Sequence, residues 1–231
     1  LSALQSAEDG KLLAGGHTLL PTLKQRLARP STLIDLSKID ALRGISVDGG
    51  VVTLGSMTTH SEVAGSQAVI DAIPALAALA GTIGDPQVRH CGTIGGSIAN
   101  NDPASDYPGA VLGLAATVVT NAREIAADDF FLGLFDTALD EGEIIVAVKF
   151  PVPEKACYMK FPQPASRFSL VGAFVAKTAD GVRMAITGAG QDGVFRVADM
   201  EAALDANFTA DAIADIQVPD TDLNGDIHAS P

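Results

Sequence analysis

Lys11-Leu12-Leu13-Ala14-Gly15-Gly16-His17-Thr18 is a short apolar run that ends in a pair of glycines, and a second pair lies in Thr93-Ile94-Gly95-Gly96-Ser97. After the first pair, apolar residues recur at helical spacing over residues 18–27, and a β-rich run follows at residues 32–36. This order predicts a strand, a tight turn, a helix and a second strand, with a phosphate-sized opening at the first turn.

Turn-forming residues divide the rest of the chain into hairpins and short helices. Asp48-Gly49-Gly50 and Asp180-Gly181 each separate two β-rich runs, which predicts two antiparallel hairpins. Helical patterns occupy residues 59–83, where Ala and Leu dominate and two or three short helices are expected, and residues 107–114 and 198–205. We expect residues 118–119, 143–150 and 156–161 to be strands of a second sheet, and a C-terminal lobe from about residue 168.

The composition excludes several classes of protein. The 231 residues include 28 acidic and 15 basic side chains, and the basic ones are scattered, so no nucleic-acid partner is expected. The longest apolar stretch, residues 69–83, contains Asp71 and Pro74 and is too short to form a transmembrane segment. Cys91 and Cys157 are too few for a four-thiolate metal site, and few cysteines without a signal segment favour a cytoplasmic protein.

Paired glycines suit a diphosphate, because they expose backbone N–H groups and have no Cβ to block a close approach. Thr18, Thr93 and Ser97 add hydroxyl groups beside the glycines, and His17 adds a possible donor. A single glycine pair is more often an ordinary turn. These patterns alone leave three readings open: FAD, another diphosphate, or plain loops.

Other motifs receive no functional role from the sequence. Gly188-Ala189-Gly190-Gln191-Asp192-Gly193 has the spacing of a dinucleotide fingerprint, but a strand-like run follows it where a helix is required. The histidines have no paired ligands at metal spacing, so no metal site is assigned to His60, His90 or His228. No side chain is an obvious acid, base or nucleophile, so no catalytic residue is assigned.

Longer segments around the glycine pairs resemble a known family. Residues 13–21, 93–100 and 102–106 are similar to the FAD-binding medium subunit of molybdenum hydroxylases, the family of carbon monoxide dehydrogenase and xanthine dehydrogenase. The similarity continues through residues 127–131, 141–145 and 160–167, and so covers almost the whole chain. It implies an α+β fold of the vanillyl-alcohol-oxidase/CO-dehydrogenase flavoprotein type: FAD-binding subdomains at residues 1–55 and 56–155, then a C-terminal domain with an antiparallel sheet and helices at 156–231. Both ends read as incomplete.

The resemblance also implies a set of cofactor-binding residues. The pyrophosphate and ribityl chain of FAD would contact Leu13, Ala14, Gly15, Gly16, His17, Thr18, Leu19 and Leu20, together with Thr93, Ile94, Gly95, Gly96 and Ser97. Asp106 would receive a ribityl or ribose hydroxyl, although it could also cap the helix that starts at Tyr107. Ile83 and Ile145 match apolar positions that wall the cofactor, and Lys160 matches a basic position near the flavin. Tyr107 and Tyr158 could stack on the flavin or pack in a core.

By the same resemblance, the chain is an oxidoreductase subunit that transfers electrons. A large subunit with a molybdenum cofactor would oxidise the substrate, and a small subunit with [2Fe-2S] clusters would pass electrons to FAD in this chain. FAD would then reduce an external acceptor such as NAD or a quinone. Two alternatives stay open: a self-contained FAD-dependent oxidase or reductase, and a non-catalytic flavin-binding assembly module.

Overall fold

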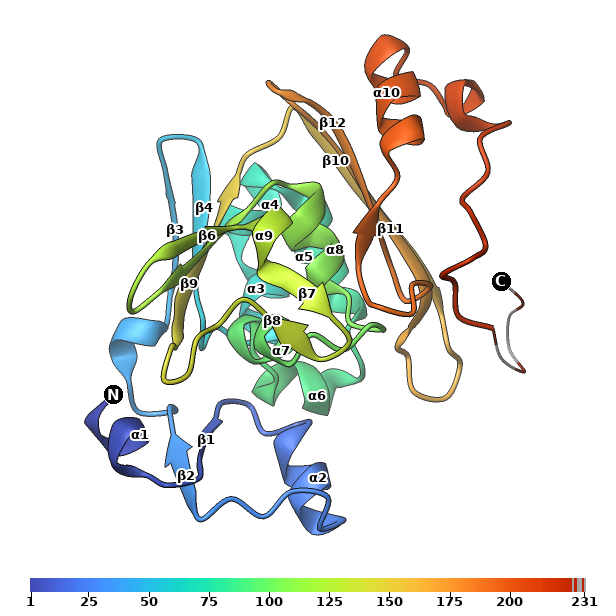
Figure 1. Cartoon of the computed structure of the whole chain (residues 1–231). Helices are drawn as coiled ribbons and strands as arrows, with labels where there is room; N and C mark the ends of the chain where they lie inside the picture. The colour runs from blue at the N-terminus through green and yellow to red at the C-terminus, as the bar shows by residue number, and fades with distance from the viewer. Residues whose placement is uncertain (226, 228–229, 231) are drawn as a thin grey trace.

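Two β-sheets face each other across a layer of helices in the computed structural model, which describes residues 1–225, 227 and 230 (Figure 1). The first sheet has the strand order β3-β4-β9-β5-β6, spanning Ile45–Asp48, Val51–Gly55, Ile145–Pro151, Thr117–Thr120 and Glu124–Ala126. The second has the order β10-β11-β12-β13, spanning Lys155–Pro162, Ser169–Thr178, Gly181–Thr187 and Phe195–Arg196. All neighbouring strands in both sheets are antiparallel.

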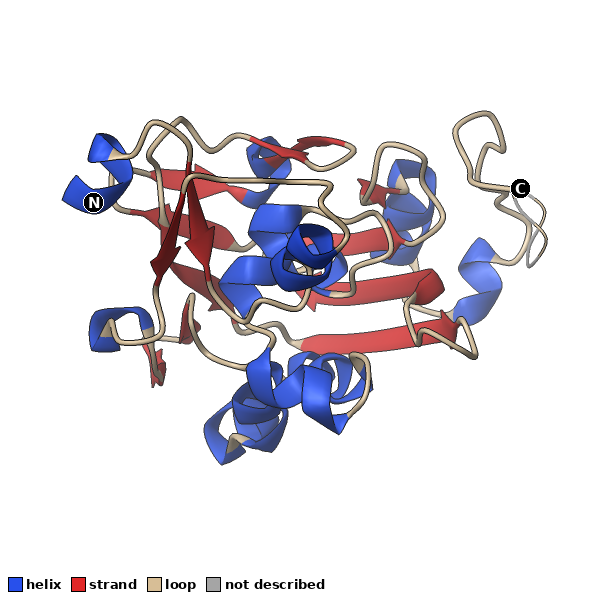
Figure 2. Cartoon of the chain, turned by 90° about the horizontal axis from the view of Figure 1, so that it is seen from below, coloured by secondary structure: helices blue, strands red, loops and turns tan. Residues whose placement is uncertain are grey.

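The helices that follow β4 are short, and several of them lie between the two sheets. They are α3 (His60–Gly65), α4 (Gln67–Ala72), α5 (Pro74–Thr82), α6 (Pro86–Cys91), α7 (Ile94–Asn100) and α8 (Tyr107–Gly113). Helix α7 contacts β4 and β9, whereas α5 and α8 contact the C-terminal sheet. Figure 2, which views the chain from below, shows helices between strands of the two sheets. Every residue of α8 is buried, because both of its sides are covered. The main core is therefore the space between the two sheets.

The N-terminal unit lies beside this core. β1 (Gly10–Leu13) pairs in parallel with β2 (Thr32–Asp35), and α2 (Leu19–Lys24) connects them, as the sequence predicted. Two further short helices flank the pair: α1 (Ser2–Ser6) and η1 (Asp40–Leu42). The first glycine pair thus lies where a strand meets a helix.

The C-terminal sheet has one face on the main core and the other under α10 (Ala198–Ala206) (Figure 1). The predicted hairpin at Asp180-Gly181 is confirmed as the turn between β11 and β12. The 188–193 motif leads into β13 and not into a helix, so the context of a dinucleotide site is missing, as predicted. The remaining elements are α9 (Ala127–Phe130), β7 (Phe131–Gly133), β8 (Asp136–Thr137) and η2 (Ala210–Ile213).

One prediction about the sheets was wrong. Residues 117–120 and 145–151 do not join residues 155–162 in one sheet; they extend the β3–β4 hairpin, and β10 starts the C-terminal sheet. The open edge of β4 pairs with β9, about a hundred residues later, and such long-range pairing leaves no local signal. The subdomain boundary predicted after residue 55 therefore falls within a continuous sheet.

Across the described ranges, no helix has the length and apolar character that a membrane crossing requires.

Candidate functional site

The two glycine turns, far apart in sequence, lie against each other. A Cβ at Gly15 would overlap the carbonyl oxygen of Cys91, and a Cβ at Gly96 would lie 3.6 Å from the Cβ of Ala14. The Nε2 atom of His17 is 3.3 Å from the carbonyl oxygen of Gln87, just before the second turn. Both turns consequently contribute to one surface, as the predicted cofactor site requires.

The first turn leaves four successive backbone donors free. Among the described residues, no acceptor receives a hydrogen bond from the N–H groups of Gly15, Gly16, His17 or Thr18. Gly16 has φ +74°, a left-handed conformation that glycine adopts without strain. These residues are half-buried or exposed. Successive free N–H groups where a strand meets a helix can bind phosphate oxygens, so the first turn fits the diphosphate of FAD.

The second turn differs from its prediction. Its glycine pair lies in the first turn of α7, where Ile94 N–H donates to Thr58 O at 3.1 Å and Gly95 N–H donates to Ser56 O at 2.9 Å. The N–H of Gly96 donates to Thr93 Oγ1 at 3.2 Å. The expectation that both glycine pairs expose free N–H groups is therefore wrong for the second pair, because Thr93 caps the helix and the chain after β4 accepts the other bonds.

His60 supports the second turn from behind. Its backbone N–H donates to Gly92 O at 3.0 Å, and a Cβ at Gly92 would lie 2.5 Å from its Nε2 atom. The ring is buried against Tyr107, with centroids 5.3 Å apart, and Nδ1 has no partner in the described part of the chain. Burial, together with the positive charges of His17 and Arg89, lowers the pKa of His60 to about 4. The ring is neutral at pH 7.

A second cluster joins the central helices to the C-terminal lobe. Lys160 Nζ lies 2.9 Å and 3.0 Å from the two carboxylate oxygens of Asp106, and both side chains are about 5% exposed. The Tyr158 hydroxyl donates to Asp106 Oδ1 at 2.5 Å, and the Ser169 hydroxyl donates to it at 3.1 Å. Burial, with the Asp106 charge, raises the pKa of Tyr158, so its phenol stays protonated. Asp106 stands at the N-cap of α8 as predicted, but its side chain makes no capping hydrogen bond.

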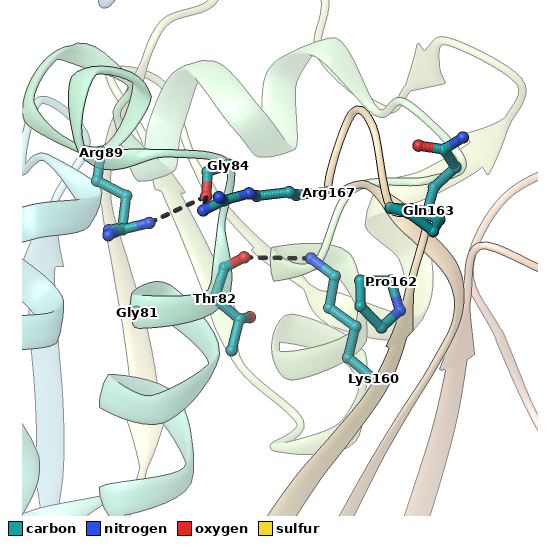
Figure 3. Close-up of a pocket in the computed structure, with 9 residues that line it drawn as sticks. Gly81, Thr82, Gly84, Arg89, Lys160, Pro162, Gln163 and Arg167 are labelled. Atoms are coloured by element: carbon teal, nitrogen blue, oxygen red, sulfur yellow. Dashed lines mark hydrogen bonds between the residues drawn. The ribbon is translucent and has the colours of Figure 1, made fainter.

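A cavity of about 380 Å³ opens beside Lys160 (Figure 3). Arg89 Nη1 donates to the carbonyl oxygens of Ile83 and Gly84 at 3.1 Å and 3.0 Å, and Arg167 Nη1 lies 3.5 Å from the same Gly84 oxygen. Lys160 Nζ is 3.4 Å from Thr82 O. The full lining is Gly81, Thr82, Gly84, Arg89, Lys160, Pro162, Gln163, Pro164 and Arg167, which includes three cations and no carboxylate. Such a lining suits a polar or anionic group.

Residues 1–153 match the family described as the FAD binding domain in molybdopterin dehydrogenase. The chain belongs to this family. It is 36% identical to the carbon monoxide dehydrogenase medium chain of Hydrogenophaga pseudoflava, over 96% of this chain and 84% of the relative. It is also 36% identical to the nicotine 6-hydroxylase medium subunit of Paenarthrobacter nicotinovorans, over 98% and 85%. A solved structure of the Hydrogenophaga pseudoflava enzyme has a TM-score of 0.84 at 37% identity, and covers 92% of this chain and 78% of that one.

The chain is thus a FAD-binding subunit of the molybdenum hydroxylase type, an oxidoreductase component. The predicted family, α+β fold and FAD cofactor are confirmed. The individual FAD contacts stay predictions. The structure brings the 13–20 turn to the 93–97 turn, and it joins Asp106 to Lys160. Ile145 is instead buried in the main core, whereas Ile83 is half-buried at the edge of the cavity.

The sequence assigned no role to three residues of this FAD-binding subunit that the structure places at the site: Ser169 holds Asp106, and Arg89 and Arg167 line the cavity. Tyr158, for which stacking on the flavin or core packing was left open, instead donates a hydrogen bond to Asp106. The spacing of Tyr158 and Lys160 was a usable signal, because residues i and i+2 share one face of a strand. Tyr107 is fully buried in the core. His228 lies outside the described residues, and among the rest no group of three His, Cys, Asp or Glu side chains could hold a metal ion.

Proposed function

We propose that FAD binds with its diphosphate at the 15–18 turn and its flavin end toward the cavity of Lys160. The observation that carries this proposal is the row of four free N–H groups at Gly15 to Thr18, in a turn that packs against the second turn. The resemblance supports the same orientation of FAD, since it assigns the glycine turns to the pyrophosphate and Lys160 to the flavin. Bound FAD supplies electron transfer, because flavins accept electrons singly and release them in pairs.

The residues of the chain then bind FAD, orient it and surround it with charged groups. The free N–H groups neutralise phosphate charge, and α7 supplies a fixed support for them. Lys160, Arg89 and Arg167 place positive charge around the cavity, which favours a cofactor that becomes more negative on reduction.

We propose that the electrons come from partner subunits and leave to an external acceptor. Two of the relatives are the medium chain of carbon monoxide dehydrogenase and the medium subunit of nicotine 6-hydroxylase, which supports other subunits as partners. The resemblance implies that these are a large subunit with a molybdenum cofactor and a small subunit with [2Fe-2S] clusters. NAD or a quinone would be the acceptor. Two exposed free cysteines, Cys91 and Cys157, support a cytoplasmic location.

Titration of the purified chain with FAD, followed by flavin fluorescence, tests the proposal. ADP carries the diphosphate without the flavin, so we expect ADP to compete with FAD and riboflavin to compete much less. Failure to bind FAD, or equal competition by riboflavin and ADP, would contradict the diphosphate site. FAD reduction by a candidate substrate without partner subunits would favour the self-contained enzyme instead.

A further inference from the structure

Three donors from the C-terminal lobe converge on one buried carboxylate. Asp106 belongs to the start of α8, whereas Tyr158 and Lys160 are on β10 and Ser169 starts β11. All four hydrogen bonds reach Asp106 within 3.1 Å. The carboxylate is therefore held from three directions by a different part of the chain.

The ion pair between Asp106 and Lys160 does not itself need the hydrogen bonds from Tyr158 and Ser169. Lys160 already contacts both oxygens of Asp106, and each further donor must itself be taken from water. Gly172, opposite Lys160 in the sheet, makes room for the Tyr158 hydroxyl, since a Cβ there would lie 2.5 Å from it. The backbone of β11 is thus shaped to admit this hydroxyl.

The position of the Lys160 ammonium depends on how strongly Asp106 attracts it. Its Nζ atom lies between the carboxylate and Thr82 O, on the wall of the cavity (Figure 3). Donors from Tyr158 and Ser169 disperse the negative charge of Asp106, so less of the ammonium's field is cancelled within the pair. With fewer donors, the carboxylate would cancel more of the ammonium's field at the cavity.

We propose that Tyr158 and Ser169 are positioning residues that act through Asp106 and Lys160 to raise the midpoint potential of bound FAD. The inference rests on the proposed function, which places the flavin end at this cavity. A cation at the wall stabilises the reduced cofactor more than the oxidised one, because reduction adds negative charge. Neither Tyr158 nor Ser169 is among the residues that line the cavity, so their effect on the cavity passes through Lys160.

The test compares midpoint potentials of the full chain loaded with FAD, measured against a reference dye. We expect Tyr158→Phe to lower the equilibrium constant for reduction about three- to tenfold, a fall of up to about 30 mV for a two-electron couple. Ser169→Ala should shift the potential in the same direction by less. Tyr107→Phe is the matched control. Tyr107 is fully buried, and its hydroxyl has no partner among the described residues, so FAD in this variant should have the same midpoint potential as in the parent chain.

A double variant distinguishes an effect of Tyr158 that passes through Lys160 from a general disturbance of the structure. In a Lys160→Met background, Tyr158→Phe should leave the potential unchanged, because the group through which it acts is gone. If Lys160→Met does not fold, Lys160→Arg with and without Tyr158→Phe serves instead, and the tyrosine effect should persist there. An unchanged potential in Tyr158→Phe, or an equal shift in Tyr107→Phe, would overturn the inference. Failure of the parent chain to bind FAD would instead overturn the proposed function.

Discussion

At Gly15 to Thr18 four backbone N–H groups have no acceptor in the described part of the chain, whereas at Ile94 to Gly96 three successive N–H groups are all donated within it. The first turn is half-buried or exposed, and the second is largely buried. Both contain a glycine pair flanked by threonine. A glycine pair with a nearby threonine therefore produces a free set of donors in one place and a saturated helix start in the other.

The difference teaches what each glycine is for. In the second turn, Gly95 permits α7 to pack on the segment after β4, so its role is in the fold. In the first turn, Gly16 permits a left-handed backbone within the set of free N–H groups, so the role we propose for it is in binding. Substitutions at Gly95 and at Gly16 should consequently affect different measurements.

Gly95→Ala should have the largest effect. Its Cβ would lie 2.6 Å from the Cβ and 2.7 Å from the carbonyl oxygen of Ser56, which are parts of a buried segment that cannot move aside easily. We expect a loss of about 3 kcal/mol in the free energy of unfolding, measured by urea denaturation without FAD. Gly16→Ala is the comparison variant: its nearest neighbour would be the flexible end of Leu20, and the left-handed φ should cost only about 1 kcal/mol. Equal losses in the two variants would remove the distinction between the turns.

His60, which packs behind the second turn, should make the stability of the chain depend on pH. Its pKa is about 4 in the folded chain and near 6.5 when unfolded, so between these values only the unfolded chain takes up the proton. The contribution of His60 to stability is complete above pH 6.5 and falls as the pH decreases. Relative to pH 7, the loss at pH 5 should be roughly 2 kcal/mol in the parent chain.

His60→Leu should remove this part of the pH dependence, as followed by urea denaturation at pH 7, 6 and 5. The exposed His90, replaced in His90→Gln, is the control and should retain the slope of the parent chain. A slope unchanged by His60→Leu would show that the residue behind the second turn is not buried in its neutral form.

Local features of this fold were predictable from the sequence, and long-range ones were not. The strand–turn–helix at Gly15-Gly16 and the hairpin at Asp180-Gly181 depend on neighbouring residues, and both are confirmed. The pairing of β4 with β9 and the ion pair of Asp106 with Lys160 join distant segments, so no local pattern carries them. The resemblance placed both members of that pair near the cofactor, but not in contact with each other.

The hydrogen bonding of the second turn was also beyond the sequence, since Ser56 and Thr58 accept its N–H groups through their backbone oxygens. A backbone acceptor has no residue-type signature, so a glycine pair with free donors and one with saturated donors look alike in sequence. Only the residue that caps the helix, Thr93, gave a hint of the second arrangement.

Gly96→Ala should have the smallest effect on the fold and is the sharpest probe of the shared surface. Within α7 an alanine favours the helix by up to about 1 kcal/mol over glycine, which offsets the tight approach of its Cβ, 3.1 Å, to Thr93 Oγ1. The free energy of unfolding should therefore change by less than about 0.5 kcal/mol. The added methyl group points toward Ala14 in the first turn, where the two turns meet. If FAD is held between them, its dissociation constant should rise at least several-fold while the denaturation curve stays in place. An unchanged dissociation constant would confine the diphosphate to the first turn and leave α7 only a supporting role.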